Sequence, residues 1–144
     1  MKIKIKLNEK LDNVPWEILT RLFEKVNWGY RSPEDIRNSF SKSAVCVFAY
    51  DNEELIGFGR TIDDGMYYAL IVDLVVNPSY QGKGIGAMVV NTIRAQLNDY
   101  KFVTLTSAPG KDGFYKKMGW KKQSSSFIWP VDEQQKLEHC EIER

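Results

Sequence analysis

The first residues of the chain alternate between apolar and polar side chains. From Met1 to Leu7, every second residue is apolar and a lysine stands at each position between. Such alternation predicts a strand with one apolar and one polar face. A row of lysines along the polar face is typical of an edge strand. The apolar face consists of Ile3, Ile5 and Leu7, and the polar face of Lys2, Lys4 and Lys6.

Helical spacing follows in two segments. Between Val14 and Asn27, apolar residues recur three or four positions apart, which predicts an amphipathic helix. The sequence SPED, at Ser32 to Asp35, then predicts the start of a second helix that ends near Ser41. Serine is a favourable N-cap, proline suits the first turn, and the acid three residues after the serine completes the cap.

The apolar pattern then changes to that of strands. Three apolar segments separated by short turns predict an antiparallel meander over residues 44–51, 54–62 and 66–76. Asn52 and Glu53 form the first turn. Gly65 lies in the second turn, where it tolerates the positive φ that a tight turn requires.

A helix and a further strand follow at the spacing of a crossover unit. Apolar positions from Ile85 to Leu97 predict a helix of about four turns, and residues 102–107 the next strand. Because a crossover connects strands that run the same way, strands 66–76 and 102–107 are expected to be parallel neighbours. The last predicted elements are a short helix over 110–119, a strand over 125–131 and a charged tail from Asp132.

Composition and charge narrow the class of protein. Hydrophobic residues make up 43% of the 144 positions and charged residues 27%, which is right for a globular protein and wrong for a disordered one. The length suggests a single domain, predicted over 1–131 and followed by the tail over 132–144. A formal net charge of +1 gives no global field for nucleic acid or an anionic membrane, so neither is expected as a partner. The apolar runs are too short to cross a bilayer.

Cysteine and histidine usage excludes a zinc site of the usual kind. Cys46 and Cys140 lie far apart, form no CxxC, and are accompanied by the single histidine, His139. The first residues contain no apolar core of a signal peptide. Reduced thiols in a cytoplasmic protein are therefore expected.

Three glycines fall within five residues in the stretch YQGKGIG, at Tyr80 to Gly86. Gly82, Gly84 and Ala87 formally match the dinucleotide pattern G-x-G-x-x-G/A, but five residues separate the first glycine from its strand, and the next strand does not end in an acid. Two alternatives remain. One is an ordinary turn into a helix, and the other is a cradle in which successive N–H groups from Gln81 onward bind a pyrophosphate with help from the helix dipole.

The segment VVNPSYQGKGIG resembles the acetyl-CoA signature of the GNAT N-acetyltransferases, Q/R-x-x-G-x-G/A. Gln81, Gly84 and Gly86 occupy its defining positions, and the signature likewise follows a strand and opens a long helix. A second segment, GFYKKMGW at Gly113 to Trp120, resembles the family's F-Y-x-x-x-G-F. The resemblance implies an α/β fold with a GNAT-like mixed central sheet, in which an antiparallel meander precedes a parallel βαβ crossover with splayed strands 66–76 and 102–107.

The resemblance also implies acetyl-CoA as cosubstrate, in a reaction that requires no metal. In the family, the pantetheine arm enters the gap between the splayed strands. Carried over by position, the residues that contact this arm are Leu74, Val75 and Val76. Those that bind the pyrophosphate are Gln81, Gly82, Lys83, Gly84, Ile85, Gly86 and Ala87.

Acetyl transfer to an amine benefits from a base. An alkylammonium has a pKa of ~10.4, so about one molecule in a thousand is free amine at pH 7, and a base is often worth ~10²–10⁴ in rate. Asp73 interrupts the apolar run ALIVDLVV, where a carboxylate is costly unless it has a partner or a task. The resemblance favours Asp73 as the base. The alternatives are a carboxylate held by backbone or by Arg60, and a base at Asp63 or Asp64 that acts through water.

Two further groups complete the predicted chemistry. Tyr115 matches the family tyrosine that faces the sulfur of CoA and protonates it. The alternative is an aromatic side chain packed beside Phe114, which is taken as the core residue of the pair. The backbone N–H of Leu74 or Val75 is expected to polarise the thioester carbonyl.

The sequence indicates the acceptor-binding residues less clearly than the cosubstrate-binding ones. Trp28 and Tyr30 lie in the loop between the first two helices, which borders the acceptor site in the family. Arg60 and Tyr68 lie on central strands, and packing is the alternative for all four. Three further aromatic residues are assigned to the core or to contacts of a homodimer: Trp120, Phe127 and Trp129. The oligomeric state stays open.

Together these features predict an enzyme that moves an acetyl group from acetyl-CoA to a primary amine of a small molecule, by direct transfer in a ternary complex. One alternative is acetylation of a protein N-terminus or lysine, for which the near-neutral charge predicts no acidic groove. Another is a non-catalytic acyl-CoA-binding regulatory module. The presence of both Asp73 and Tyr115 argues against that module.

Overall fold

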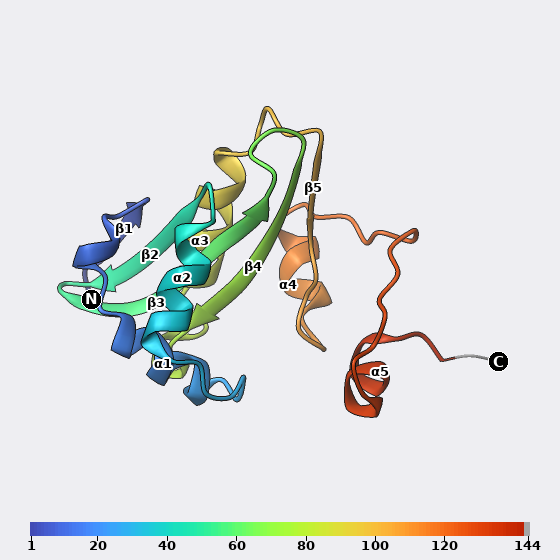
Figure 1. Cartoon of the computed structure of the whole chain (residues 1–144), viewed down its shortest axis with the longest axis horizontal. Coiled ribbons are helices and arrows are strands. Elements are labelled where there is room, and N and C mark those ends of the chain that lie inside the picture. Colours follow the sequence, from blue (N-terminus) through green and yellow to red (C-terminus); the bar gives the residue numbers. More distant parts are fainter. Residues whose placement is uncertain (143–144) are drawn as a thin grey trace. The chain divides into compact units, whose positions relative to one another are not determined.

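A computed structural model of the protein describes residues 1–142, and within them the chain divides into two compact units. Unit 1 comprises Met1–Leu105, and unit 2 begins at Thr106 (Figure 1). Among the described residues, no helix is long and apolar enough to cross a membrane. The domain boundary expected at residue 131 stays a prediction.

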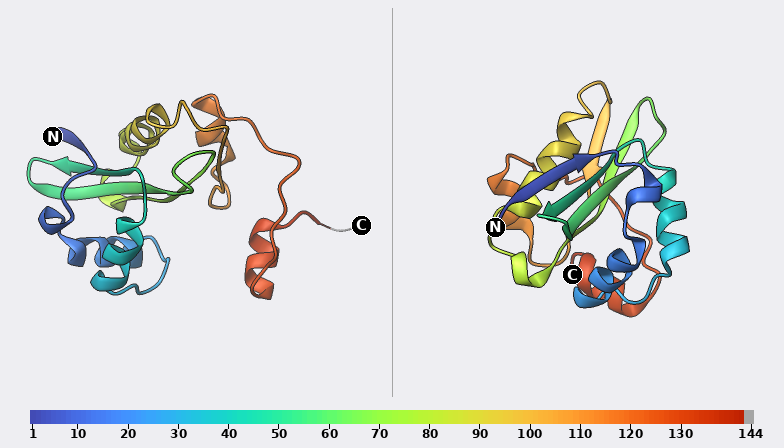
Figure 2. Two further views of the ribbon diagram at one scale, coloured as in Figure 1. Left: turned by 45° about the horizontal axis from the view of Figure 1, so that its top comes forward. Right: turned by 90° about the vertical axis from the view of Figure 1, so that its left-hand side faces the viewer.

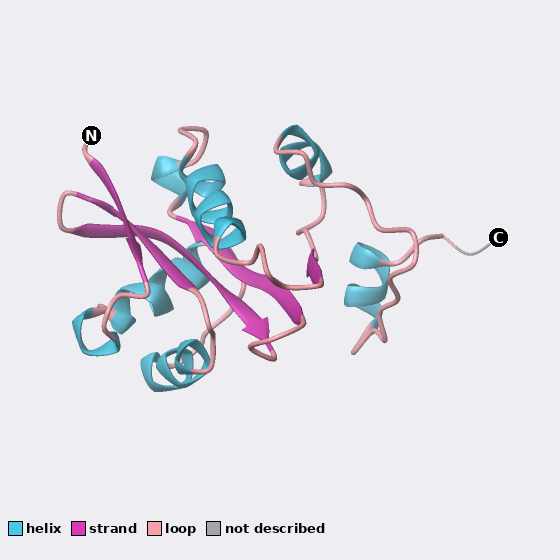
Figure 3. Ribbon diagram, turned by 90° about the horizontal axis from the view of Figure 1, so that it is seen from above, coloured by secondary structure: helices cyan, strands magenta, loops and turns pink. Residues whose placement is uncertain are grey.

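A five-stranded mixed sheet forms the centre of unit 1 (Figure 3). Its strands follow one another in chain order; the first four pair antiparallel, and the fifth runs parallel to the fourth. This arrangement confirms the predicted meander and crossover. The strands are β1 (Ile3–Leu7), β2 (Cys46–Asp51), β3 (Glu54–Asp63), β4 (Tyr68–Val76) and β5 (Phe102–Leu105).

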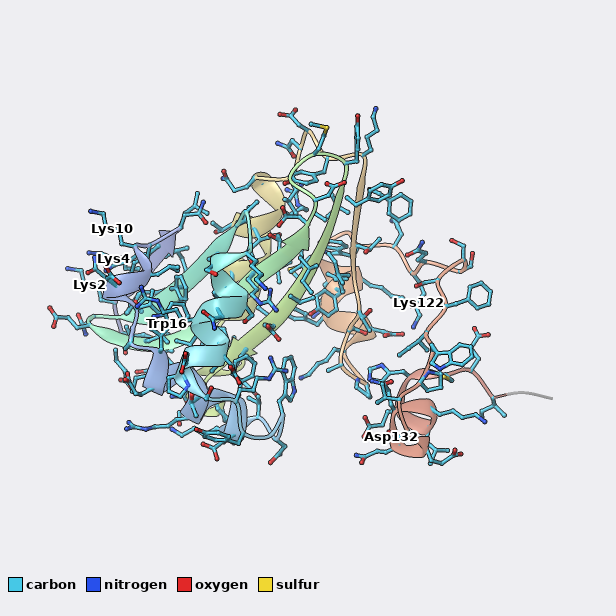
Figure 4. The ribbon with its side chains drawn as sticks, in the orientation of Figure 1. Lys2, Lys4, Lys10, Trp16, Lys122 and Asp132 are labelled. Atoms are coloured by element: carbon cyan, nitrogen blue, oxygen red, sulfur yellow. The ribbon has the colours of Figure 1, made fainter. Side chains whose placement is uncertain are left out.

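Strand β1 lies at the edge of the sheet, as its lysines predicted. The side chains of Lys2 and Lys4 point to solvent (Figure 4). The alternation fails at its end, where Leu7 is 42% exposed and Lys6 is half-buried with its ammonium 4.7 Å from the centre of the Tyr50 ring. An aromatic neighbour can thus cover a lysine stem that the simple pattern assigns to water.

Helices cover both faces of the sheet (Figure 2). Helices α1 (Trp16–Lys25) and α2 (Pro33–Ser41) lie on one face and α3 (Ile85–Ala95) on the other, and two short 3₁₀ helices, η1 (Leu11–Asn13) and η2 (Pro78–Tyr80), precede α1 and α3. The predicted start of α2 is confirmed, because the Asp35 N–H donates to Ser32 Oγ at 3.1 Å. Helix α3 is shorter than expected; Leu97 lies beyond its end, although it is buried.

The core between the sheet and the helices α1 and α2 is largely aromatic. Phe40 lies 5.9 Å from Phe58 and 5.7 Å from Phe48, and Phe23 lies 5.2 Å from Phe58. All four are buried, and Trp16 adds an edge contact to Phe40. Aromatic pairs at these separations stabilise the fold by more than the burial of their area alone. This cluster therefore fixes α1 and α2 against β2 and β3.

The opposite face brings α3 very close to β3. A Cβ built on Gly59 would lie 3.0 Å from Ile93 Cδ1 and 3.1 Å from Val89 Cγ1, closer than side chains normally pack. A glycine in the middle of a strand is therefore explained by the approach of this helix. The same helix carries the glycine-rich segment at its first residues, so its position on β3 also positions that segment.

Unit 2 contains two short helices, α4 (Asp112–Lys117) and α5 (Glu133–His139). None of its described residues is buried, so it builds no core of its own. The strand predicted over 125–131 is wrong, since Phe127 and Trp129 lie in irregular chain with exposed fractions of 97% and 92%. A strand needs a neighbour to pair its backbone, and residues 106–142 of unit 2 contain no strand that could serve.

Candidate functional site

Strands β4 and β5 pair over only part of their length. Tyr68–Ile71 of β4 are in register with Phe102–Leu105, and β5 ends there while β4 continues to Val76. Within residues 1–142, one edge of β4 therefore has no strand partner from Val72 onward. The residues assigned to the pantetheine arm, Leu74, Val75 and Val76, all lie on this unpaired stretch.

A β-bulge opens this stretch. Phe58 faces Val75 and Arg60 faces Val72, so Asp73 and Leu74 both lie opposite the single residue Gly59. Asp73 adopts a φ of +54°, in the left-handed region that few residues other than glycine occupy. Such a conformation costs free energy and persists only where surrounding contacts fix it. The bulge therefore gives the Asp73 side chain a direction that a regular strand would not provide.

The glycine-rich segment forms a turn between η2 and α3. Gly84 is the N-cap of α3 with a φ of +82°, and Gly82 has a φ of +79°. No atom of the described part of the chain lies within 4 Å of a Cβ built on either glycine. The first hydrogen bond of the helix is donated by the Met88 N–H to the Gly84 carbonyl at 3.1 Å.

Six consecutive backbone N–H groups, from Gly82 to Ala87, donate to no acceptor within residues 1–142. They precede the first helical hydrogen bond and combine with the positive end of the helix dipole. Open space at two glycines and free donors at a helix N-terminus suit an oxyanion such as a pyrophosphate. The residues present thus fit the phosphates of a CoA molecule.

Side-chain contacts connect this segment to the sheet. Gln81 Nε2 donates to the Val76 carbonyl at 3.3 Å, and the Lys83 ammonium lies 5.4 Å from the centre of the Tyr80 ring. The Tyr80 hydroxyl donates to Asp51 Oδ2 at 2.7 Å, and this hydrogen bond raises the pKa of Tyr80 to about 12. The turn is thus attached both to the end of β4 and to the end of β2.

Asp73 is held by two arginines. Its Oδ2 accepts from Arg60 Nε at 2.8 Å, and its Oδ1 accepts from Arg31 Nη1 at 3.0 Å, while its side chain is 9% exposed. The pairing with Arg60 matches one alternative that the sequence left open. Asp73 as the base stays a prediction, and that role requires one oxygen to exchange its guanidinium for the acceptor amine.

The structure brings some of the acceptor candidates together. Trp28 lies 5.9 Å from the Arg31 guanidinium, and Arg60 binds Asp73 directly. Tyr68 instead lies 6.2 Å from Phe102 at the amino end of β4. Tyr30 is 70% exposed and belongs to the same loop as Trp28. Their roles in binding stay predictions.

Asp63 and Asp64, the alternative bases, both hold backbone in place. Asp63 accepts from the N–H groups of Ala44 and Gly65 at 3.0 Å. Asp64 Oδ1 accepts from the N–H groups of residues 66, 67 and 68, and these bonds lower the pKa of its carboxyl. Each carboxylate therefore stabilises the turn between β3 and β4.

Tyr115 lies on α4 in unit 2. Burial raises the pKa of its hydroxyl above the ordinary value, so the hydroxyl is protonated at neutral pH and is a weaker acid than a solvated tyrosine. The ring of Phe114 lies 5.0 Å from it at an angle of 82°. Phe114 was expected to be the core residue of the pair, but both side chains are half-buried because unit 2 has no core to receive either.

Sequence reasoning missed Arg31. It follows Tyr30 in the loop between α1 and α2, 42 positions from Asp73, and no local pattern connects them. A charged residue directly before the SPED helix start reads as an ordinary solvated loop residue. Only the packing of α1 and α2 on the sheet brings this guanidinium to the bulge.

Comparison with known proteins supports the family resemblance that the motifs suggested. Residues 20–129 match the family model described as acetyltransferase (GNAT) domain. The chain belongs to the GNAT acetyltransferase family. The match begins within α1, spans all the later elements of unit 1 and extends into unit 2.

Individual GNAT relatives agree. An uncharacterized N-acetyltransferase, ycf52, of Pyropia yezoensis is 30% identical over 110 residues, which cover 72% of this chain and 63% of that protein. Serotonin N-acetyltransferase 2, chloroplastic, of Oryza sativa subsp. japonica is 30% identical over 71% of this chain and 54% of its own length. The chain thus spans between about half and three fifths of the length of these two curated relatives.

A solved structure matches over its whole length. The GNAT-family acetyltransferase of Streptococcus pneumoniae TIGR4 has a TM-score of 0.74 and 30% identity, and the match covers 91% of this chain and 99% of that one. The mixed sheet with its parallel final pair is therefore the GNAT fold, as the sequence resemblance implied.

Proposed function

We propose that this protein moves the acetyl group of acetyl-CoA to a primary amine of a small molecule, by direct transfer in a ternary complex. The observation that carries the proposal is the row of six free N–H groups from Gly82 to Ala87, next to a β4 edge without a strand partner. An anion-binding turn and an unpaired strand edge, joined end to end, suit a ligand with a pyrophosphate and an amide-containing arm. The name of the rice relative, a serotonin N-acetyltransferase, supports a small amine as acceptor.

The residues divide the work as follows. The backbone from Gln81 to Ala87 binds the pyrophosphate, and the edge at Leu74, Val75 and Val76 binds the arm. Acetyl-CoA supplies an acyl group activated as a thioester. The N–H of Leu74 or Val75 donates to the carbonyl oxygen, on which negative charge develops as the amine approaches.

Two side chains move protons in this scheme. Asp73 accepts the proton that the ammonium must lose before its nitrogen can form the new C–N bond. Tyr115 donates a proton to the sulfur as the C–S bond breaks. Each proton then has a stated origin and destination, and the products are the amide and free CoA.

The experiment is an assay of CoA release from acetyl-CoA across a panel of amines, with peptide substrates as a second arm. A blank without amine corrects for the protein's own thiols. Release with small amines supports the proposal, whereas release with peptides alone shows a protein acetyltransferase. Tight binding of acetyl-CoA without release from any acceptor shows a binding module.

Gly84→Val tests the turn itself. A β-branched side chain there occupies the space facing the free N–H groups, and we expect the affinity for acetyl-CoA to fall by more than about tenfold, the worth of one hydrogen bond to a charged group. Gly65→Val is the matched control, because Gly65 also has a positive φ, +75°, and open space at its Cβ. Both variants carry the same backbone strain. Calorimetry that finds Gly84→Val within a few-fold of wild type contradicts the assignment.

A further inference from the structure

Arg31 is fixed in place although it lies in a loop. Its guanidinium stacks 4.2 Å from the centre of the Phe23 ring and donates to Asp73 at 3.0 Å. Its backbone carbonyl accepts from Thr20 Oγ1 at 2.8 Å. A guanidinium held on an aromatic face and by an ion pair presents its other N–H groups in a defined direction.

The two arginines of the cluster differ in what they leave free. Arg60 is 12% exposed and also directs Nη1 to Ser43 Oγ at 3.3 Å and to the Ser39 carbonyl at 3.5 Å. Arg31 is 40% exposed, and Asp73 is the one acceptor that its guanidinium has within residues 1–142. Arg60 is thus committed to the fold, whereas Arg31 keeps most of its five donors for another partner.

The charges in this cluster do not balance. Two guanidinium groups share the single carboxylate of Asp73, so the three side chains together carry a net charge of +1. This excess lies at the bulge where the unpaired edge of β4 begins, and the turn that binds anions follows the other end of that edge. An acetyl-CoA arm that runs from the turn along the edge ends near the cluster.

We propose that Arg31 binds an acidic group of the acceptor, so that the acceptor is an amine that also carries a carboxylate or a phosphate. The inference rests on the proposed function and names its substrate class. Binding exchanges one ion pair for two: the ammonium of the acceptor pairs with Asp73, and its acidic group pairs with Arg31. Every charge then keeps a partner, whereas an acceptor with an ammonium alone would leave Arg31 without one.

Guanidinium geometry favours this class of ligand. Its planar fork forms two parallel hydrogen bonds with a carboxylate or a phosphate, and such bonds are stronger than neutral ones. The two chemistries are distinguished by the test compounds: tyrosine and lysine for the carboxylate, and glucosamine 6-phosphate for the phosphate.

The test compares acceptors that differ in one charge. Tyrosine is paired with tyrosinamide, lysine with lysinamide, and glucosamine 6-phosphate with glucosamine. Amino acid amides have the less basic amine, so more of it is free at neutral pH, and their intrinsic reactivity works against the expected result. We expect wild type to favour the acidic member of at least one pair by about tenfold or more in kcat/KM, as for a charge-assisted hydrogen bond.

Arg31→Gln should remove this preference by raising the KM of the acidic acceptor and leaving the neutral one nearly unchanged. Arg31→Lys keeps the charge without the fork, so it should retain part of the preference, and it covers the case in which Arg31→Gln folds poorly. Arg37→Gln is the matched control, since Arg37 is 44% exposed and pairs with Asp12 on the surface. It should keep the full preference.

Two results overturn the inference alone: equal rates for acidic and neutral acceptors in wild type, and an equal loss for both in Arg31→Gln. The second would show that Arg31 only holds Asp73 in place. A protein that binds acetyl-CoA in calorimetry but releases no CoA with any acceptor overturns the proposed function and this inference with it.

Discussion

Unit 1 and unit 2 differ in the contacts that stabilise their structure. Unit 1 buries a continuous set of aromatic and aliphatic side chains between its sheet and its helices. Unit 2 has no buried residue among those described, and its helices α4 and α5 have six and seven residues. Helices this short are marginal without packing. Local contacts dominate instead. Asp132, at the start of α5 (Figure 4), accepts with Oδ1 from the Gln135 N–H at 2.8 Å.

The comparison also concerns function. The glycine-rich turn before α3 and the Asp73 cluster lie wholly in unit 1, whose core holds them in position. Tyr115, the proposed acid, lies in unit 2. Substitutions in the core of unit 1 should therefore affect stability, and those at its candidate site binding or turnover, whereas substitutions in unit 2 should affect turnover with little effect on the core. Four measurements test this contrast.

The largest expected effect is on stability. Phe58→Ala removes a fully buried ring between Phe23 and Phe40, and the free energy of unfolding should fall by about 3–5 kcal/mol. The matched variant Phe127→Ala removes a ring that is 97% exposed and should change stability by about 0.5 kcal/mol or less. Urea denaturation followed by circular dichroism measures both. Similar losses in the two variants would show that unit 2 contributes to the core.

The next effect concerns Asp73. If it is the base, Asp73→Asn should lower kcat by about 10²–10⁴-fold at neutral pH. The loss should shrink at high pH, where free amine is plentiful. Asp12→Asn is the control, because Asp12 also pairs with an arginine but is 85% exposed. A loss that is equal at every pH, with a lower Tm, would assign Asp73 to holding Arg31 and Arg60.

The two cysteines extend the comparison, one in each unit. Burial raises the pKa of Cys46 to about 11, and its thiol lies 3.4 Å from the Phe40 carbonyl, whereas Cys140 is half-buried. A thiol with this pKa is about one part in a thousand thiolate at pH 8. Ellman's reagent should therefore react with Cys46 at least about a hundredfold more slowly than with Cys140. In Cys140→Ser the fast phase should vanish. Two equal fast phases would mean that the core of unit 1 opens readily.

The same thiol adds a pH dependence to stability. A pKa raised by folding means that the unfolded chain loses its proton first as the pH rises. The stability that the protonated Cys46 thiol gives the folded state is thus fully present below the ordinary thiol pKa. This stability is lost as the pH rises toward about 11.

The smallest expected effect is that of Tyr115→Phe, which removes one hydroxyl. As proposed acid, Tyr115 should account for about ten- to a thousandfold in kcat, while acetyl-CoA binding and Tm barely change. An acyl donor with a more acidic thiol should recover part of the rate. Tyr100→Phe serves as the control, because Tyr100 lies in unit 1, where its hydroxyl donates to Asp63 Oδ2 at 3.4 Å. Full activity of Tyr115→Phe, with the chemical step shown to limit the rate, would assign the proton to solvent.

Local sequence predicted an element correctly wherever the sequence motif and the contact that stabilises the element lie within a few residues of each other. Ser32 caps α2 as SPED indicated, and the meander turns at Asn52 as expected. The prediction failed for 125–131, where an apolar segment with strand propensity has no strand to pair with inside unit 2. Strand propensity measures fit to a partner surface more than a property of the segment itself.

The candidate site divides in the same way. The glycine-rich turn into α3 could be predicted from sequence, because it is made from consecutive residues, and its binding of a pyrophosphate stays a prediction. The partners of Asp73 could not be fully predicted, because Arg31 lies 42 positions away and reaches it through the packing of α1 on the sheet. The bulge likewise depends on the register between β3 and β4, which no local pattern records.

By itself, the sequence determined the mixed sheet, the order of its elements and the glycine-rich turn into α3, since each follows from periodicity or from consecutive residues. Tertiary structure decided the direction of the Asp73 carboxylate, its second guanidinium partner Arg31 and the excess positive charge beside the β4 edge. Ion pairs across long sequence separations form only when a core fixes the elements that carry them, and that core lies in unit 1.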